Sequence, residues 1–105
     1  MTLYTGATVT TTPTINSGAS TTILSANVNR KFLLIQNNSA ANVAINTEGA
    51  ALSGIAPTST NKCIVLPSSA GNNTLMFDPM YVPSGAITCY QTSGGQINTV
   101  TVVEG

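Results

Sequence analysis

Apolar residues in this chain fall in short blocks separated by polar residues. The most apolar block lies in residues 30–37, Arg-Lys-Phe-Leu-Leu-Ile-Gln-Asn, where four consecutive apolar residues stand between a basic pair and an amide pair. A block this short, followed by Asn-rich turn residues, predicts a β-strand that is covered on both faces. We therefore expect a central strand at 30–37, with the rest of the chain packed around it.

Period-two alternation of apolar and polar residues predicts further strands along the chain. In three of them one face carries a pair of apolar residues: Val43 with Ile45, Ile87 with Cys89, and Val100 with Val102. A fourth segment places Leu75 and Phe77 on one face and Met76 on the other. The expected strands occupy residues 20–26, 42–47, 62–66, 74–78, 86–92 and 97–103.

Turn residues between these segments predict two hairpins. The Asn-rich stretch after residue 37 predicts that strand 30–37 reverses and pairs with strand 42–47. The Gly94-Gly95 pair predicts a tight hairpin between strands 86–92 and 97–103, because such turns need positive φ angles. Residues 48–61 are small and polar and predict a long loop, a length that is typical of function or disorder.

About seven short strands with frequent turn signals predict an all-β fold, a compact antiparallel β-sandwich or jelly roll. No window shows useful helical periodicity, and the absence of tryptophan disfavours an antibody-type immunoglobulin module. At 105 residues the chain predicts a single sandwich domain, residues 20–105, preceded by an extended Thr-rich arm, residues 1–19. The arm either pairs with a sheet edge of its own or a neighbouring subunit, or is disordered.

Charged residues make up only 6% of the chain, against about 25% in typical globular proteins, and the net charge is zero. A neutral surface lacks colloidal repulsion and favours association, so we expect a homo-oligomer. Three cations are too few for the phosphate contacts of nucleic-acid binding, and no apolar run is long enough to span a bilayer. We therefore expect neither nucleic acid nor membrane as a partner.

The chain contains no histidine, the commonest general base and metal ligand. Glu48 and Asp78 are the one carboxylate pair formally available to a glycosidase, and Cys63 and Cys89 lack a base that would activate a thiol. Both cysteines lie in apolar strand segments and are expected to be free thiols. We expect no enzymatic activity, no cofactor and no metal site.

The central block also suggests an interface. Phe32 and Leu34 point to one side of a strand and Leu33 and Ile35 to the other, and in a two-layer sandwich only one side meets the core. The second side must be covered by the arm, the 48–61 loop or another subunit. A second candidate surface is the Met- and Tyr-containing segment 76–82, whose methionines alternatively cap the core. The predicted interface residues are Tyr4, Val9, Leu33, Ile35, Met76, Met80 and Tyr81.

Four segments, 29–37, 42–45, 82–87 and 100–105, carry a family resemblance. In particular, Asn-Arg-Lys-Phe-Leu-Leu-Ile-Gln-Asn and Val-Pro-Ser-Gly-Ala-Ile resemble small virion proteins of tailed bacteriophages, of the head decoration (cement) or head-fibre and tail-accessory type. The resemblance implies a β-sandwich or jelly roll without catalytic residues that binds a capsid surface in many copies.

The same resemblance implies the partners and the location of the protein. Its partner would be the major capsid protein or another virion protein, and it would reside in a virion assembled in the host cytoplasm. The alternative is a receptor- or glycan-recognition module of a phage fibre or tail, for which Tyr81 and Tyr90 are the available aromatic contacts.

Overall fold

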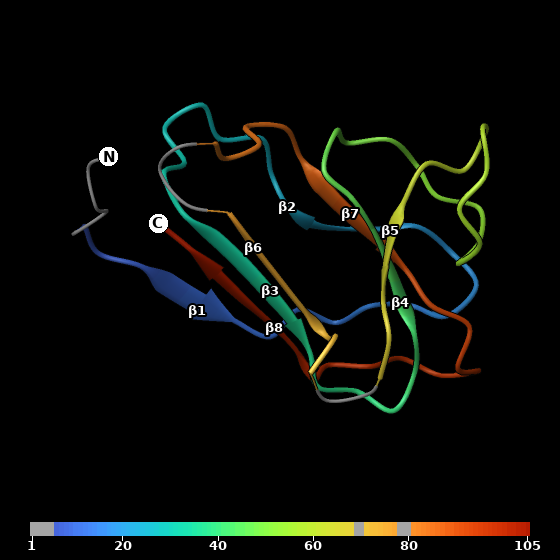
Figure 1. Ribbon diagram of the computed structural model, residues 1–105. Coiled ribbons are helices and arrows are strands. Elements are labelled where there is room, and N and C mark those ends of the chain that lie inside the picture. Colours follow the sequence, from blue (N-terminus) through green and yellow to red (C-terminus); the bar gives the residue numbers. More distant parts are fainter. Residues whose placement is uncertain (1–5, 69–70, 78–80) are drawn as a thin grey trace.

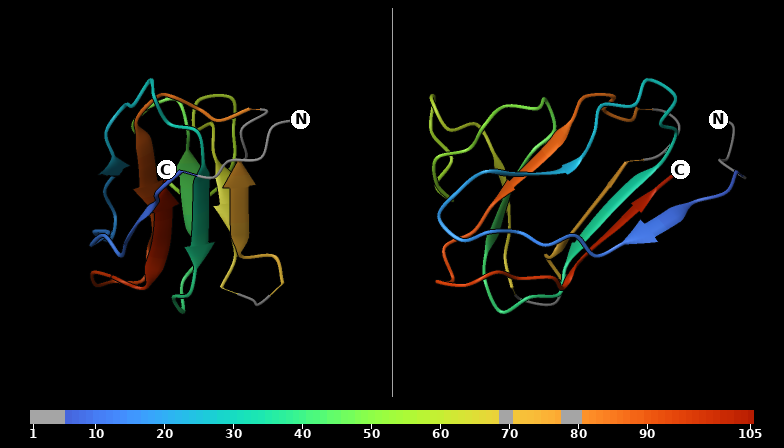
Figure 2. Two further views of the ribbon diagram at one scale, coloured as in Figure 1. Left: turned by 90° about the vertical axis from the view of Figure 1, so that its left-hand side faces the viewer. Right: turned by 180° about the vertical axis from the view of Figure 1, so that it is seen from behind.

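The computed structural model describes residues 6–68, 71–77 and 81–105, which form eight β-strands and no helix (Figure 1). The strands are β1 (Val9–Thr11), β2 (Thr21–Leu24), β3 (Leu33–Asn37), β4 (Val43–Asn46), β5 (Ile64–Leu66), β6 (Thr74–Phe77), β7 (Ile87–Tyr90) and β8 (Val100–Glu104). They form two four-stranded sheets packed as the layers of a sandwich (Figure 2). The predicted all-β sandwich is confirmed, and β1 is a strand beyond the seven expected.

The two sheets differ in strand order. The front sheet runs β1-β8-β3-β6 and the back sheet β2-β7-β4-β5, and neighbouring strands are antiparallel in both. Successive strands lie in opposite sheets at every connection except that from β4 to β5. This alternation is the strand order of a jelly roll, in which the chain passes repeatedly over the ends of the sandwich.

Both predicted hairpins are wrong. β3 pairs with β6 and β8, whereas β4 pairs with β5 and β7, so the two strands lie in opposite sheets. β7 and β8 are likewise in different sheets, and of the two glycines between them only Gly94 has a positive φ, 87°. Turn residues specify that the chain reverses, but the sheet that each strand joins is decided by pairing with strands distant in sequence.

The core lies between the sheets and consists of the inward residues of the strands. All three apolar pairs predicted from alternation are buried in it, and Leu75 and Phe77 pack against it while Met76 points outward. The fully packed members are Ile15, Leu33, Ile35, Val43, Ile45, Leu66, Ile87, Cys89, Val100 and Val102.

The described part of residues 1–19 is built into the sandwich of its own chain. β1 pairs with β8 at the edge of the front sheet. Further on, Ile15 is buried in the core and exchanges backbone hydrogen bonds with Ile97, at 2.8 Å from Ile15 N to Ile97 O and 3.1 Å in return. Of the outcomes expected for the arm, pairing with a sheet edge of its own is therefore the one observed.

Candidate functional site

The outer face of the front sheet carries a row of uncharged side chains across its four strands. The strand register aligns Met76 of β6 with Leu34 of β3, Leu34 with Val103 of β8, and Val103 with Thr10 of β1. Directly opposed residues of antiparallel strands point to the same face, so these four lie side by side. We refer to Leu34, Met76 and Val103 as the outer strip.

No described strand lies over the outer strip; the left view of Figure 2 looks onto this sheet and shows the chain that leads into β1 crossing in front of its upper part. Met76 is 60% exposed, and Leu34 and Val103 are each half-buried. A polar row borders the strip, in which Gln36 is aligned with Thr74 and Thr101, and its Nε2 donates to Thr74 Oγ1 at 3.2 Å. The face therefore presents apolar groups beside hydroxyl and amide groups.

Part of the outer face of the back sheet is covered by residues 47–61, which we refer to as the covering loop. Thr88 of β7 points outward, is buried, and donates from Oγ1 to the Ala50 carbonyl at 2.6 Å. Leu52 is buried in the same loop, and Ala44, an outward residue of β4, has no exposed area. The long loop that the sequence predicts is thus packed onto its own sheet.

Buried amide side chains shape the covering loop at both of its ends. The Asn46 Oδ1 accepts the N–H group of Ala50 at 3.0 Å at the start of the loop. At the other end Asn61 Nδ2 donates to the carbonyls of Gly54 and Ala56, both at 3.0 Å. The amides satisfy backbone groups that would otherwise lose water without gaining a partner.

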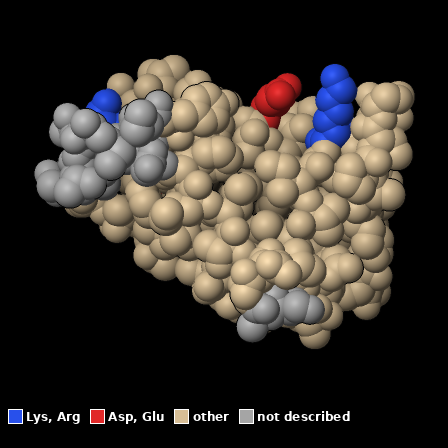
Figure 3. All heavy atoms as spheres, in the orientation of Figure 1, with Lys and Arg blue, Asp and Glu red and all other residues tan. Residues whose placement is uncertain are grey.

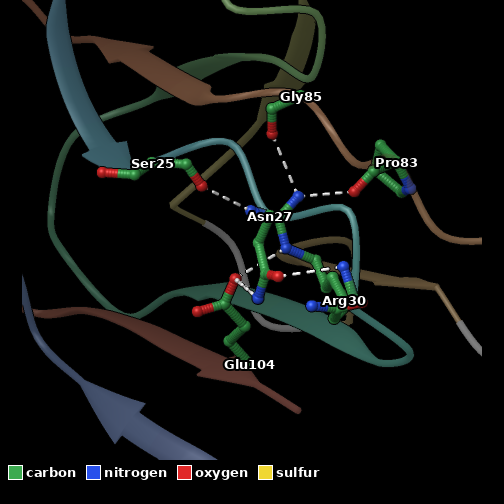
Figure 4. A network of polar contacts seen from close by, with 7 residues as sticks. Ser25, Asn27, Arg30, Pro83, Gly85 and Glu104 are labelled. Carbon is green, nitrogen blue, oxygen red and sulfur yellow. Dashed lines mark hydrogen bonds and ion pairs between the residues drawn. The ribbon is translucent and has the colours of Figure 1, made fainter.

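Arg30 joins the two sheets at one end of the sandwich (Figure 4). It lies just before β3, and its Nε is 2.7 Å from Glu104 Oε2 on β8. Its Nη1 donates to the carbonyls of Pro83 and Gly85, before β7, and its Nη2 donates to the Ser25 carbonyl, after β2, at 2.9 Å. The Arg30 side chain has no exposed area, so this cation is a structural connection and offers no charge to a ligand.

The prediction that Leu33 and Ile35 lie at an interface is wrong. Leu33 and Ile35 have 0% exposed area and belong to the core, where they cannot meet a partner. Alternation separates the two faces of a strand but does not say which one points inward, because that depends on the opposite sheet. Leu34 and Val103, outward apolar residues that were not selected, occupy the exposed face instead. The same alternation would have identified them if the side of the strand that carries Leu34 had been taken as the outer one.

Of the remaining predicted interface residues, those that the structure describes lie at the two edges of the front sheet. Met76 and Tyr81, 67% exposed, lie at the β6 edge, where the Tyr81 ring packs edge-on against Phe77 with 5.9 Å between ring centroids. Val9, 64% exposed, lies on β1 at the opposite edge. Tyr4 and Met80 fall outside the described residues.

Both cysteines are free thiols, as expected. Cys89 points into the core, and burial raises the pKa of its thiol to about 12. Cys63 is half-buried, and burial raises the pKa of its thiol as well. Both thiols therefore stay protonated near neutral pH, which makes them poor nucleophiles.

Two open depressions offer little chemistry. One, of about 190 Å³, lies beside β4 and β5 and is lined in part by Glu48, Lys62 and Cys63. The other, of about 510 Å³, lies between Ile55 of the covering loop and the ends of the sandwich, and carries no charged lining residue. Within the described ranges no cluster of three or more Cys, Asp or Glu could hold a metal ion. Asp78, which with Glu48 makes the one carboxylate pair formally available to a glycosidase, falls outside those ranges.

The view in Figure 3 places the charged side chains along the upper margin of the molecule and leaves the rest of that described face uncharged. Among the residues that the structure describes, no helix is long and apolar enough to cross a membrane. The chain matches no protein-family model, and no curated protein or solved structure matches it either.

Proposed function

We propose that this chain is a non-enzymatic structural component of a virion, a decoration or cement protein that binds a capsid surface in many copies. The contact surface in this proposal is the outer face of the front sheet, and the partner is the major capsid protein or another virion protein. The sequence resemblance to small tailed-bacteriophage virion proteins supports the proposal, and so does the jelly-roll strand order, which recurs in viral capsid domains. A fold that hosts many functions supports it only by analogy.

The observation that carries the proposal is the uncovered outer strip. A Leu, a Met and a Val lie in one row on a sheet face where period-two alternation normally places polar residues. Uncharged apolar groups beside hydroxyl and amide groups are typical of protein–protein contact surfaces. Because the described outward residues of the four strands carry no charge, a partner that binds them loses no ionic hydration.

The alternative, a receptor- or glycan-recognition module, has weaker support. Sugar-binding surfaces use aromatic side chains, and the two candidate tyrosines do not share a face. Tyr81 packs on Phe77 at the β6 edge of the front sheet, whereas Tyr90 lies on β7 in the back sheet. A glycan-array signal that is abolished by Tyr81→Ala or Tyr90→Ala would nevertheless favour this alternative over the proposed capsid contact.

The proposal is tested on virus particles purified from the natural source of the chain, with copy number measured by quantitative mass spectrometry. We expect many copies per particle, and we expect Leu34→Lys to lower occupancy at least about tenfold, because it buries a charge at the contact. Thr22→Lys, on an exposed residue of the back sheet, is the matched control and should retain full occupancy. Particles without the chain, or equal occupancy for both variants, would overturn the proposal.

A further inference from the structure

β6 is an edge strand whose outward backbone groups can be identified from the ladder. Asn37 N donates to Asn73 O at 2.8 Å, whereas Phe32 N donates to Gly105 O at 3.0 Å on the other side of β3. Hydrogen-bonded and non-hydrogen-bonded pairs alternate along antiparallel strands, so the odd-numbered residues of β3 bond to β6. The backbone N–H and C=O groups of residues 75 and 77 in β6, and those of residue 73 just before it, therefore point toward β3.

It follows that Thr74 and Met76 direct their backbone N–H and C=O groups away from β3. No other described strand pairs with β6. The β6–β3 register runs without a bulge through four consecutive pairs, and the strand Thr-Leu-Met-Phe carries no charge and no proline. A regular, uncharged edge strand of this kind is a template for pairing with another strand.

The other three sheet edges are blunted. β1 has three residues and is followed by Pro13, and β2 contains a bulge between Thr22 and Leu24. β5 also has three residues, with Lys62 before it and Pro67 directly after it. Short strands, bulges, lysine and proline are the devices that prevent edge-to-edge pairing. β6 differs from them in its length and regularity: its four residues pair in unbroken register, and Asp78 and Pro79 come only after the strand in the sequence.

We propose that β6 pairs antiparallel with β6 of a second copy of this chain, so that two front sheets join into one eight-stranded sheet. The same strand of a second copy is the longest described edge without a bulge, and antiparallel pairing of two identical strands is two-fold symmetric. The zero net charge of the chain and the uncharged strand remove repulsion between the copies. This inference is independent of the proposed virion function, because it uses the edge of the front sheet and not its outer face.

The outward groups define the register of this pairing. Thr74 of one copy must face Met76 of the other for both outward residues of both strands to exchange hydrogen bonds. This places Leu75 opposite its own symmetry mate on the inner side of the joined sheet. Leu75 is half-buried in the isolated chain, so the contact also removes apolar area from water.

The first test uses the unmodified chain, with mass measured by sedimentation velocity and amide hydrogen exchange followed by NMR over a range of concentrations. We expect the mass to double as concentration rises, with the Thr74 and Met76 amides becoming protected over the same range. The Thr10 amide, which points outward at the β1 edge, should stay unprotected. A chain that remains monomeric, or a dimer that leaves the Met76 amide unprotected, would overturn the proposal.

The second test removes one outward donor. Thr74→Pro deletes an N–H group that β3 does not use, and proline is tolerated at such edge positions. We expect self-association to weaken at least about tenfold, since each two-fold dimer loses two hydrogen bonds. Thr10→Pro makes the same change at the opposite edge and should leave the dimer intact. Equal dimerisation of both variants would count against β6, and if Thr74→Pro does not fold, the exchange experiment alone decides.

Discussion

The two outer faces of this sandwich are finished in different ways. On the back sheet the covering loop seals Thr88 and Ala44 from water with small residues, and buried amides hold the loop in place. On the front sheet no described strand lies over the outer strip, and its Met76 is 60% exposed. Among the described residues, a loop therefore covers part of one outer face, whereas the outer strip on the other face stays partly exposed.

The covering loop is the described segment that makes this difference. Gly49 has a φ of 79°, and a Cβ atom added to it would lie 3.5 Å from Ala86 Cβ. This glycine lets the chain turn tightly after β4 and return over the back sheet. No comparable long connection leaves the front sheet toward its outer face in the described chain.

The largest effect is expected where the two sheets are tied together. Arg30→Met should lower the free energy of unfolding by about 3–5 kcal/mol, because it leaves Glu104 and three backbone carbonyls without their buried partner. Lys31→Met, at the neighbouring exposed residue, should change it by less than about 0.5 kcal/mol. Urea denaturation of both variants measures the difference. Similar small losses of unfolding free energy in both variants would mean that Arg30 does not hold the two sheets together.

A smaller effect separates the covered face from the uncovered one. Leu52→Ala in the covering loop should lower the free energy of unfolding by about 2–3 kcal/mol, as for a buried leucine that leaves a cavity. Leu34→Ala in the outer strip should lower it by less than about 1 kcal/mol, because Leu34 is already partly hydrated. Both are read from urea midpoints of the monomer. Equal losses would erase the contrast between the two faces.

The smallest effect concerns the core that both faces enclose. The Cys89 thiol has an ordinary pKa of 9.0 and a folded pKa of about 12, so its contribution to stability is fully present below pH 9. Above that pH the unfolded chain loses a proton that the folded chain keeps, and the free energy of unfolding falls by up to about 1.4 kcal/mol per pH unit.

Urea midpoints measured from neutral pH to about pH 10 follow this slope. Cys89→Ala should remove most of the slope, whatever it does to the overall stability. Cys63→Ala, at the half-buried thiol, should leave most of it in place. A slope that persists unchanged in Cys89→Ala would show that other groups cause it.

Alternation predicted which residues share a face, and local turn chemistry predicted where most strands end. The inward pair Val100 and Val102 and the outward Met76 are placed as their spacing requires. The sequence did not predict that Leu33 and not Leu34 is the buried residue of its strand, because both faces of 30–37 are apolar. The sequence also did not predict β1 as a strand, because Val-Thr-Thr is too short and too polar to show a period-two pattern.

By itself the sequence determined an all-β, single-core, charge-poor chain without histidine chemistry, because composition and period-two spacing are local properties. Only the tertiary structure decided which strands pair, since β3 meets β6 and β8 and not the adjacent β4. It also decided the role of the two ends of the block at 30–37. Arg30 and Asn37 are the polar ends of this block, and both are buried and bond to carbonyls near the opposite sheet. A buried polar group needs partners, and those partners are far away in the sequence and adjacent only in the folded chain.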